Sequence, residues 1–136
     1  IKAEMLIRES LRIRILLNDS MYIGYSSDLL GNILCYQYKL GSETKELLEK
    51  SLAIYTRHLG PDARNTAFAH ISLGKYYLKL ANLRQPYLTR KEHMRQSEIK
   101  YKEAVRIFTK IFGPDDPRTI GFSSNLSVIS NELSEA

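Results

Sequence analysis

Two stretches of this sequence repeat one pattern, Ser51-Leu52-Ala53-Ile54-Tyr55-Thr56-Arg57-His58-Leu59-Gly60-Pro61-Asp62 and Ala104-Val105-Arg106-Ile107-Phe108-Thr109-Lys110-Ile111-Phe112-Gly113-Pro114-Asp115. Each has apolar residues at helical spacing followed by Gly-Pro, which ends a helix. A third copy, residues 10–17, keeps the helical half but is followed by Asn18-Asp19-Ser20. Because repeated units bury their apolar faces on one another, the pattern predicts an array of similar helical units.

The spacing of the copies defines the repeat. Leu11 and Leu52 are 41 residues apart and Leu52 and Val105 are 53 apart, so we expect a period of about 42 residues with an insertion in the last interval. The other helix of each unit is marked by Leu-Gly or Leu-Ser at residues 30–31, 73–74 and 126–127. The sequence therefore predicts one repeat domain over residues 1–136, interrupted by an insertion at about residues 84–96. It opens in the middle of a unit, so we expect a piece of a longer array.

Turn and capping residues predict six helices. Their expected bounds are residues 2–17, about 22–40, 42–59 with Ser42 as N-cap, about 63–82 capped by Asp62, about 90–112, and about 117–133 after Asp116-Pro117. The second helix is expected to end at Gly41, after a start in Asn18-Asp19-Ser20. In the fifth, Thr89 and Glu92 have the spacing of a capping box, so the insertion should add basic, exposed turns to the front of this helix.

Composition excludes several classes of protein. The chain has 136 residues, 43% of them apolar and 26% charged, which is typical of a folded globular domain and not of a disordered tail. The lone Cys35 cannot form an internal disulfide, so we expect a reducing compartment, the cytoplasm. The sequence has no apolar run of about 18 residues, so we expect no membrane span.

The helical pairs resemble the tetratricopeptide repeat. Residues 73–77, Leu-Gly-x-x-Tyr, match the core of its first helix, and the second helix has a matching small, bulky, small, apolar pattern. That pattern occurs as Thr44, Leu48, Ser51, Leu52, as Ala3, Ile7, Ser10, Leu11 and as Ser97, Tyr101, Ala104, Val105. The period and Gly-Pro-Asp are similar to the longer, kinesin light chain-like subtype. The resemblance implies an all-α, right-handed α-solenoid of about three antiparallel hairpins, in which the small residues lie where two helices touch.

The resemblance also implies a protein-protein interaction scaffold or adaptor, which binds a partner peptide or domain on the concave face lined by the first helices. The positions carried over are Tyr25, Asp28, Asn32, Tyr36, Phe68, Ile71, Lys75, Lys79, Ser124, Asn131 and Glu132. Lys75 and Lys79 are one helical turn apart near Tyr36 and Phe68, which favours an acidic peptide with an apolar anchor. A carboxylate clamp of the chaperone type is not expected, because Asp28 replaces its Lys.

The alternative is binding of nucleic acid or an acidic surface by the basic helix at residues 90–110. The candidate residues are Arg90, Lys91, Arg95, Lys100 and Lys102. Helical spacing predicts that Lys102 pairs with Glu98 and Arg106 with Glu103, which favours an ordinary solvated face.

Motifs of catalysis, metal binding and cofactor binding are absent from the sequence, so we expect no enzyme, no metal and no cofactor. A reactive pair of Cys35 and His70 would require the fold to bring them together. The apolar edge of the first helix, residues Leu6, Ile7, Leu11 and Ile13, is expected to fray or self-associate.

Overall fold

The computed structural model describes residues 1–16 and 19–135, and every regular element in these ranges is an α-helix. The helices are α1 (Lys2–Leu16), α2 (Ser20–Tyr36), α3 (Ser42–Leu59), α4 (Arg64–Ala81), α5 (Tyr87–Phe112) and α6 (Pro117–Glu135). The predicted all-α fold with six helices is confirmed. None of these helices combines the length and apolarity needed to cross a membrane.

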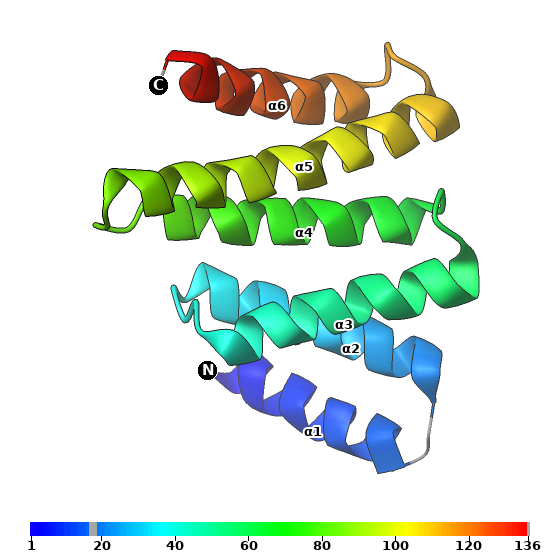
Figure 1. Cartoon of the computed structure of the whole chain (residues 1–136). Coiled ribbons are helices and arrows are strands. Elements are labelled where there is room, and N and C mark those ends of the chain that lie inside the picture. The colour runs from blue at the N-terminus through cyan, green and yellow to red at the C-terminus, as the bar shows by residue number, and fades with distance from the viewer. Residues whose placement is uncertain (17–18, 136) are drawn as a thin grey trace.

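The helices form a layered array in which each packs against the next along the chain, with α1 and α6 at opposite ends (Figure 1). The backbone of α2 also approaches that of α4, whereas within the described residues the backbone of α3 approaches neither α1 nor α5. The array therefore curves toward α2 and α4. We call the side formed by α2, α4 and α6 the concave face.

Both Gly-Pro turns end their helices in the same way. Gly60 has φ 99° and Gly113 has φ 89°, values that side chains other than glycine rarely adopt. The amide of Gly60 donates to the carbonyl of Thr56 at 3.0 Å, and that of Gly113 to Thr109 at 2.9 Å. The repeated sequence thus forms a repeated local structure.

The helices of each hairpin meet where a bulky residue lies against a glycine. A Cβ atom added to Gly31 would lie 2.6 Å from Leu48 Cδ2, and one added to Gly74 would lie 2.7 Å from the ring of Tyr101. We call these two sites the glycine notches. The predicted small contact residues of the same hairpins, Thr44, Ser51, Ser97 and Ala104, are all buried. The Ser97 hydroxyl also donates to the carbonyl of Gly74 at 2.8 Å.

The core lies within the hairpins and between them, and it is largest around α4, α5 and α6. It joins fully buried Ile107 and Phe108 to Ala67 and Ile71, with further apolar residues of α6 packed against it. Phe108 lies 5.1 Å from Phe68 edge to face and stacks on Phe122 at 5.1 Å between ring centroids. In contrast, α1 contributes no buried residue.

The end of α2 differs from the prediction. The helix ends at Tyr36, because Tyr38 adopts φ 59° and the amide of Lys39 donates back to the carbonyl of Leu34 at 2.9 Å. This is the hydrogen-bond pattern that ends many helices, with a tyrosine in the left-handed position where glycine is usual. Gly41 instead precedes α3 as its N-cap, so the prediction of Ser42 at that position was wrong.

Three predicted caps had different outcomes. Thr89 lies inside α5, which begins at Tyr87, so the capping box does not form, although the insertion does extend the helix. Asp62 does not cap α4; its carboxylate instead pairs with Arg106 at 2.8 Å and with Lys110. Asp116 does cap α6, accepting from the amide of Arg118 at 2.9 Å.

The start of α2 agrees with the prediction, since Asp19 Oδ1 accepts a hydrogen bond from the amide of Tyr22 at 3.5 Å. The predictions for Leu17 and Asn18 lie outside the described residues. The expected bounds of α3, α4 and α6 agree with the structure to within two residues.

We predict that Gly74→Leu and Ser51→Leu each lower the free energy of unfolding by roughly 1–3 kcal/mol, because both positions are buried and a leucine side chain there would be overpacked. Urea or thermal unfolding measures this change. Lys50→Leu, an exposed neighbour on α3, is the control and should unfold like the parent. Unchanged stability of both enclosed-site variants would rule out the close helix contact.

We also predict that amide hydrogens in residues 2–16 exchange faster than those in residues 44–80. Side chains of α1 are at most half-buried, and its ion pair from Arg8 to Glu43 is exposed and contributes little stability. Hydrogen exchange of a dilute, monomeric sample read by mass spectrometry tests this difference. Equal protection in both ranges would show that α1 is held as firmly as the central hairpins.

Candidate functional site

The concave face contains most of the predicted peptide-binding residues, but one belongs to the core. Ile71 is only 3% exposed and packs in the cluster that contains Phe108. Its inclusion in the groove was wrong, because α5 covers this side of α4. The remaining predicted residues are exposed or half-buried: Tyr25, Tyr36, Lys75, Ser124, Asn131 and Glu132 are exposed, and Asp28, Asn32, Phe68 and Lys79 are half-buried.

Tyr25, Asp28 and Phe68 lie together at the end of the face nearest the start of α2. With Tyr55 and Asn65 they line a hollow of about 180 Å³. An adjoining hollow of about 310 Å³ is lined by the same two tyrosines and Asn65, together with Met21 and Tyr22. Burial, and next the charge of Asp28, raise the pKa of Tyr55 to about 12. The sequence prediction missed four residues of these two hollows, Met21, Tyr22, Tyr55 and Asn65. The two tyrosines at positions 22 and 25, one helical turn apart, could have indicated that Tyr22 lies beside the predicted Tyr25.

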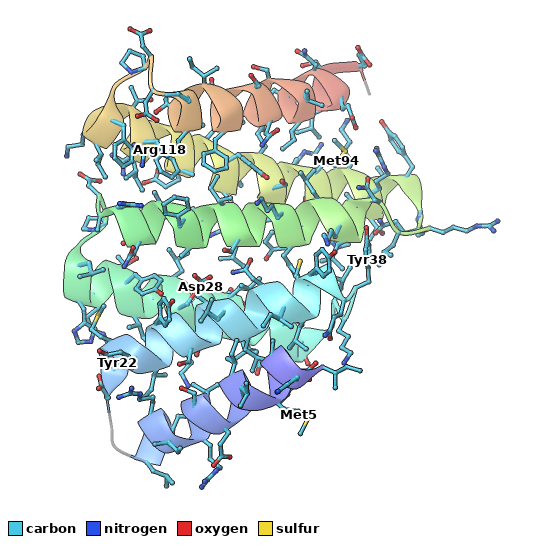
Figure 2. All side chains as sticks on the ribbon, turned by 180° about the vertical axis from the view of Figure 1, so that it is seen from behind. Met5, Tyr22, Asp28, Tyr38, Met94 and Arg118 are labelled. Atoms are coloured by element: carbon cyan, nitrogen blue, oxygen red, sulfur yellow. The ribbon has the colours of Figure 1, made fainter. Side chains whose placement is uncertain are left out.

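A hydrogen-bonded bridge joins α2 to α4 in the middle of the face. The Asn32 side chain donates to Asp28 Oδ1 at 2.9 Å and to the hydroxyl of Ser72 at 3.1 Å. Ser72 in turn donates to Asp28 Oδ1 at 3.2 Å. Burial raises the pKa of Asp28, while the hydrogen bonds that it accepts from Ser72 and Asn32 oppose this change. Asp28 and Asn32 therefore hold the two helices together; Asp28 is labelled on α2 in Figure 2.

Lys79 is also engaged within the protein. Its Nζ donates to the carbonyl of Cys35 at 3.1 Å, at the end of α2, where a positive charge is favoured by the helix dipole. The same atom lies 4.4 Å from the ring centroid of Tyr38 and 5.6 Å from that of Tyr36. In contrast, Lys75 is exposed and forms no ion pair with any described residue. Of the two predicted lysines, only Lys75 has an uncommitted charge.

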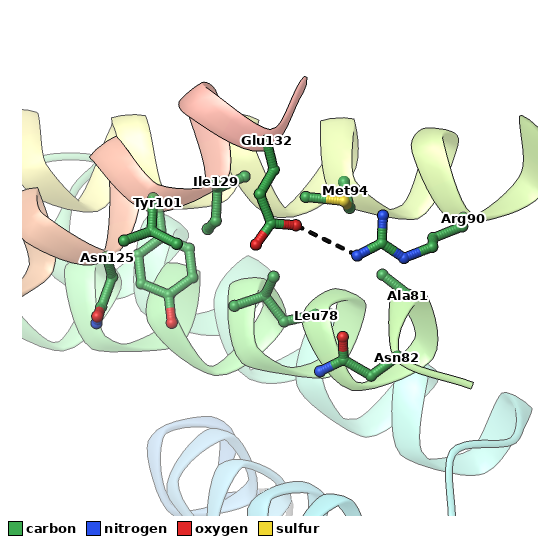
Figure 3. A pocket seen from close by; sticks show the side chains of 10 residues that line it. Leu78, Ala81, Asn82, Arg90, Met94, Tyr101, Asn125, Ile129 and Glu132 are labelled. Atoms are coloured by element: carbon green, nitrogen blue, oxygen red, sulfur yellow. Dashed lines mark hydrogen bonds and ion pairs between the residues drawn. The ribbon is translucent and has the colours of Figure 1, made fainter. Parts of the chain in front are cut away.

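Another hollow lies between α4 and α6, with α5 as its floor (Figure 3). It measures about 300 Å³ and is lined by Leu78, Ala81, Asn82, Arg90, Met94, Tyr101, Asn125, Val128, Ile129 and Glu132. We call it the α4–α6 pocket. Glu132, one of the predicted residues, accepts from Arg90 at 3.2 Å across one end. Arg90 and Met94 come from the front of α5, so the insertion helps to build the pocket.

The pocket exists because α6 lies farther from α4 than α2 does. Within the described chain the backbones of α4 and α6 do not approach each other as those of α2 and α4 do. In the corresponding place between α2 and α4, the Lys79 side chain covers the end of α2. Ser124 lies outside the pocket, lining a different hollow between α5 and α6, and Asn131 lines neither.

The predicted basic patch is largely neutralised by neighbouring acids. Arg90 pairs with Glu132, Arg95 with Glu92 at 3.7 Å and Lys102 with Glu98 at 3.9 Å. The predicted pairs of Lys102 with Glu98 and of Arg106 with Glu103 both form. Lys91 and Lys100 make no ion pair in the described ranges. Lys91 lies 6.0 Å from the ring of Tyr87.

The structure does not bring the side chains of Cys35 and His70 together. Cys35 is packed among Leu48, Leu73 and Tyr76, and burial raises the pKa of its thiol. Burial, followed by the charge of Lys100, lowers the pKa of His70 to about 4, so this histidine is neutral at physiological pH. No group of three or more residues with metal-ligating side chains occurs among the described residues.

Comparison with known families agrees with this geometry. Residues 26–62 match the family model described as Tetratricopeptide repeat. The match covers most of the α2–α3 hairpin and its Gly-Pro-Asp ending, and the α4–α5 hairpin repeats the same glycine notch and turn. No curated protein matches the sequence significantly. The kinesin light chain-like subtype stays a prediction. Together, the repeated hairpins and this match support the prediction of a tetratricopeptide repeat protein.

Proposed function

We propose that this protein is an adaptor that holds an extended segment of a partner protein along its concave face. Tetratricopeptide repeats generally mediate protein-protein interactions. The single observation that carries the proposal is the α4–α6 pocket, a hollow of mixed apolar and polar lining on the face formed by the first helices. We expect one bulky apolar side chain of the partner to occupy it.

The dimensions and lining of the pocket support this use. Its volume of about 300 Å³ is at the lower end of the range for ligand pockets, which suits a single side chain. Leu78, Met94, Tyr101 and Ile129 supply apolar walls, and Asn82 and Asn125 supply amides at the rim. Interfaces concentrate their binding energy in anchors of this kind, where an apolar side chain leaves water completely.

Charge favours an acidic partner segment. Lys75 is exposed on the same helix as the pocket residue Leu78 and has no intramolecular ion pair in the described part of the chain. A carboxylate next to the apolar anchor would meet this lysine. The anchor proposed from sequence, Tyr36 with Phe68, is less suitable, because Phe68 packs edge to face on Phe108 and Tyr36 faces Lys79.

The alternative function, binding of nucleic acid or another acidic surface by α5, rests on fewer charges than the sequence indicated. Three of the five basic residues already pair with glutamates, which leaves Lys91 and Lys100. Phosphate contacts would give binding that weakens steeply with salt, nearly one unit of slope per contact. An apolar anchor depends much less on salt, so the two functions can be separated.

We predict that Val128→Glu weakens binding of selected peptides by about thirtyfold, the loss of a strong anchor contact of about 2 kcal/mol. Val128 lines the pocket and is 59% exposed, so the change should not disturb the core. Peptides would be selected from a random displayed library against the parent protein, and their affinity measured by fluorescence titration at two salt concentrations.

Ile99→Glu is the matched control, because Ile99 is a similarly exposed apolar residue at 54% and lies outside the pocket. It should leave peptide affinity unchanged. Equal losses in both variants would refute the pocket as the anchor site. Tight oligonucleotide binding that disappears when Lys91 and Lys100 become Gln would instead support the alternative function.

A further inference from the structure

A second hollow on the concave face has an aromatic and acidic lining. Its lining residues are Tyr25, Asp28, Tyr55, Asn65 and Phe68, and its volume is about 180 Å³. All five come from α2, α3 and α4, which pack on one another in the middle of the chain. We call it the Tyr–Asp hollow. It shares no residue with the α4–α6 pocket, so the two are separate sites on one face.

The corresponding place one repeat later is filled with apolar side chains. There the position of Asp28 is taken by Ile71 and that of Tyr55 by Phe108. Ile71 and Phe108 are both buried in one apolar cluster. The α2–α3 hairpin thus has a carboxylate and a phenol hydroxyl where the next hairpin has only hydrocarbon. Because burying polar groups costs free energy unless they are paired, this difference indicates a role besides packing.

The carboxylate of Asp28 uses only one of its oxygen atoms within the protein. Oδ1 accepts from Asn32 at 2.9 Å and from Ser72 at 3.2 Å, whereas Oδ2 accepts no hydrogen bond from any residue that the structure describes. Asp28 also has no ion pair with a described basic side chain. Burial raises the pKa of this carboxyl group, because its charge is poorly solvated and has no counter-ion. A cation bound at Oδ2 would stabilise that charge.

The hydroxyl of Tyr55 is a second polar group without a partner. Tyr55 and Tyr76 are each 3% exposed. Tyr76 donates to the carbonyl of Leu40 at 3.0 Å, but the Tyr55 hydroxyl makes no hydrogen bond with the described part of the chain. Burial is the main cause of the raised pKa of Tyr55, and the charges of Asp28 and Tyr25 add to it. The three polar groups therefore lie near one another beside the hollow.

Aromatic rings at this end of the face already attract arginine side chains. The guanidinium carbon of Arg14 lies 4.0 Å from the ring centroid of Tyr22, and that of Arg64 lies 5.8 Å from the ring centroid of Phe68. Tyr22 belongs to the adjoining hollow, at the start of α2, and Asp28 lies farther along the same helix (Figure 2). Neither arginine pairs with Asp28. The rings thus attract guanidinium groups while the carboxylate is left for another one.

We propose that the Tyr–Asp hollow binds one arginine side chain of the partner segment, with Asp28 Oδ2 as hydrogen-bond acceptor and the Tyr25 ring against the guanidinium plane. The inference rests on the proposed function for the source of this arginine. A planar guanidinium donates hydrogen bonds in its plane while its face stacks on an aromatic ring, which an ammonium group does not do. The volume of about 180 Å³ is below the usual range for small-molecule pockets and suits a single side chain.

The site would give the partner segment a direction. The Tyr–Asp hollow is negative, whereas Lys75, on the same helix as the pocket residue Leu78, is positive and makes no ion pair in the described ranges. A segment with an arginine at one end and an acidic residue beside its apolar anchor would match both charges in one orientation only. Reversed binding would place like charges together at both sites, which disfavours it.

Small arginine derivatives test the site without a partner. N-acetyl-arginine amide, the neutral citrulline analogue and N-acetyl-lysine amide would each be titrated into the intact, isotope-labelled protein and followed by NMR. We expect the arginine amide to shift the amide signals of residues 24–28 and 64–68 and the citrulline analogue to leave them unchanged. Shifts scattered over exposed carboxylates, or equal shifts with citrulline or lysine, would overturn the assignment to a guanidinium group.

Two variants of the hollow make the test specific. Asp28→Asn keeps an oxygen for the bridge to α4 but removes the charge, so the arginine amide should bind about tenfold more weakly or worse. Tyr25→Leu removes a ring that is 54% exposed, so this variant stays folded even if Asp28→Asn does not, and it should weaken binding about threefold. Unchanged affinity for the arginine amide in Tyr25→Leu and in any folded Asp28→Asn would overturn the proposal.

Matched controls lie outside the hollow. Asp115→Asn neutralises an exposed aspartate that makes no ion pair with a described residue. Tyr87→Leu removes a ring that is 53% exposed on α5. Both variants should bind the arginine amide like the parent. Losses equal to those of the hollow variants would overturn the proposal, because binding would then depend on general surface charge and aromatic content.

The library peptides separate this inference from the proposed function. Peptides selected against the parent should contain arginine and bind Asp28→Asn more weakly. Peptides that are weakened by Val128→Glu, with no binding of the arginine amide, would overturn this inference and leave the proposed function intact. Specific binding of the arginine amide, with peptides unaffected by Val128→Glu, would support the Tyr–Asp hollow and refute the α4–α6 pocket as the anchor site.

Discussion

The fold depends on the contact between a bulky side chain and a glycine inside each hairpin. Leu48 against Gly31 and Tyr101 against Gly74 leave no room for even one added carbon atom. Such close approach lets two helices bury the small residues between them, and interiors packed at this density resist changes of volume in either direction. Because the contact recurs in both hairpins, it also fixes their common geometry and so the path of the array.

The candidate site lies where the spacing of the helices changes, because α6 is farther from α4 than α2 is. The α2 and α4 helices are joined by the bridge of Asp28, Asn32 and Ser72 and by Lys79. Between α4 and α6, the extended α5 instead supplies Arg90, which reaches Glu132 across an open space. The insertion, part of the basic segment considered as an alternative nucleic-acid-binding site, therefore contributes Arg90, Met94 and an ion pair to the α4–α6 pocket.

The repeated hairpins could be predicted from sequence, because small, bulky and helix-ending residues recur at a fixed period and act locally. Features set by distant partners could not. The pairing of Asp62 with α5 and the burial of Ile71 depend on how α5 packs against α4, between residues far apart in the sequence. The left-handed Tyr38 has no sequence signal, since tyrosine seldom adopts that conformation. The α4–α6 pocket was likewise beyond prediction, because its width depends on the distance between helices. Of its lining, Glu132 was predicted for peptide binding and Arg90 only for the separate basic patch.

The most direct test of the glycine notch is a double-mutant cycle of Gly74→Ala and Tyr101→Val, followed by urea unfolding. In the parent, Gly74→Ala should destabilise the protein, because the added Cβ would lie 2.7 Å from the Tyr101 ring, even though alanine favours a helix over glycine by about 1 kcal/mol. With Tyr101→Val the ring is gone, so the same change should become neutral or stabilising. An equal effect of Gly74→Ala in both backgrounds would contradict the account.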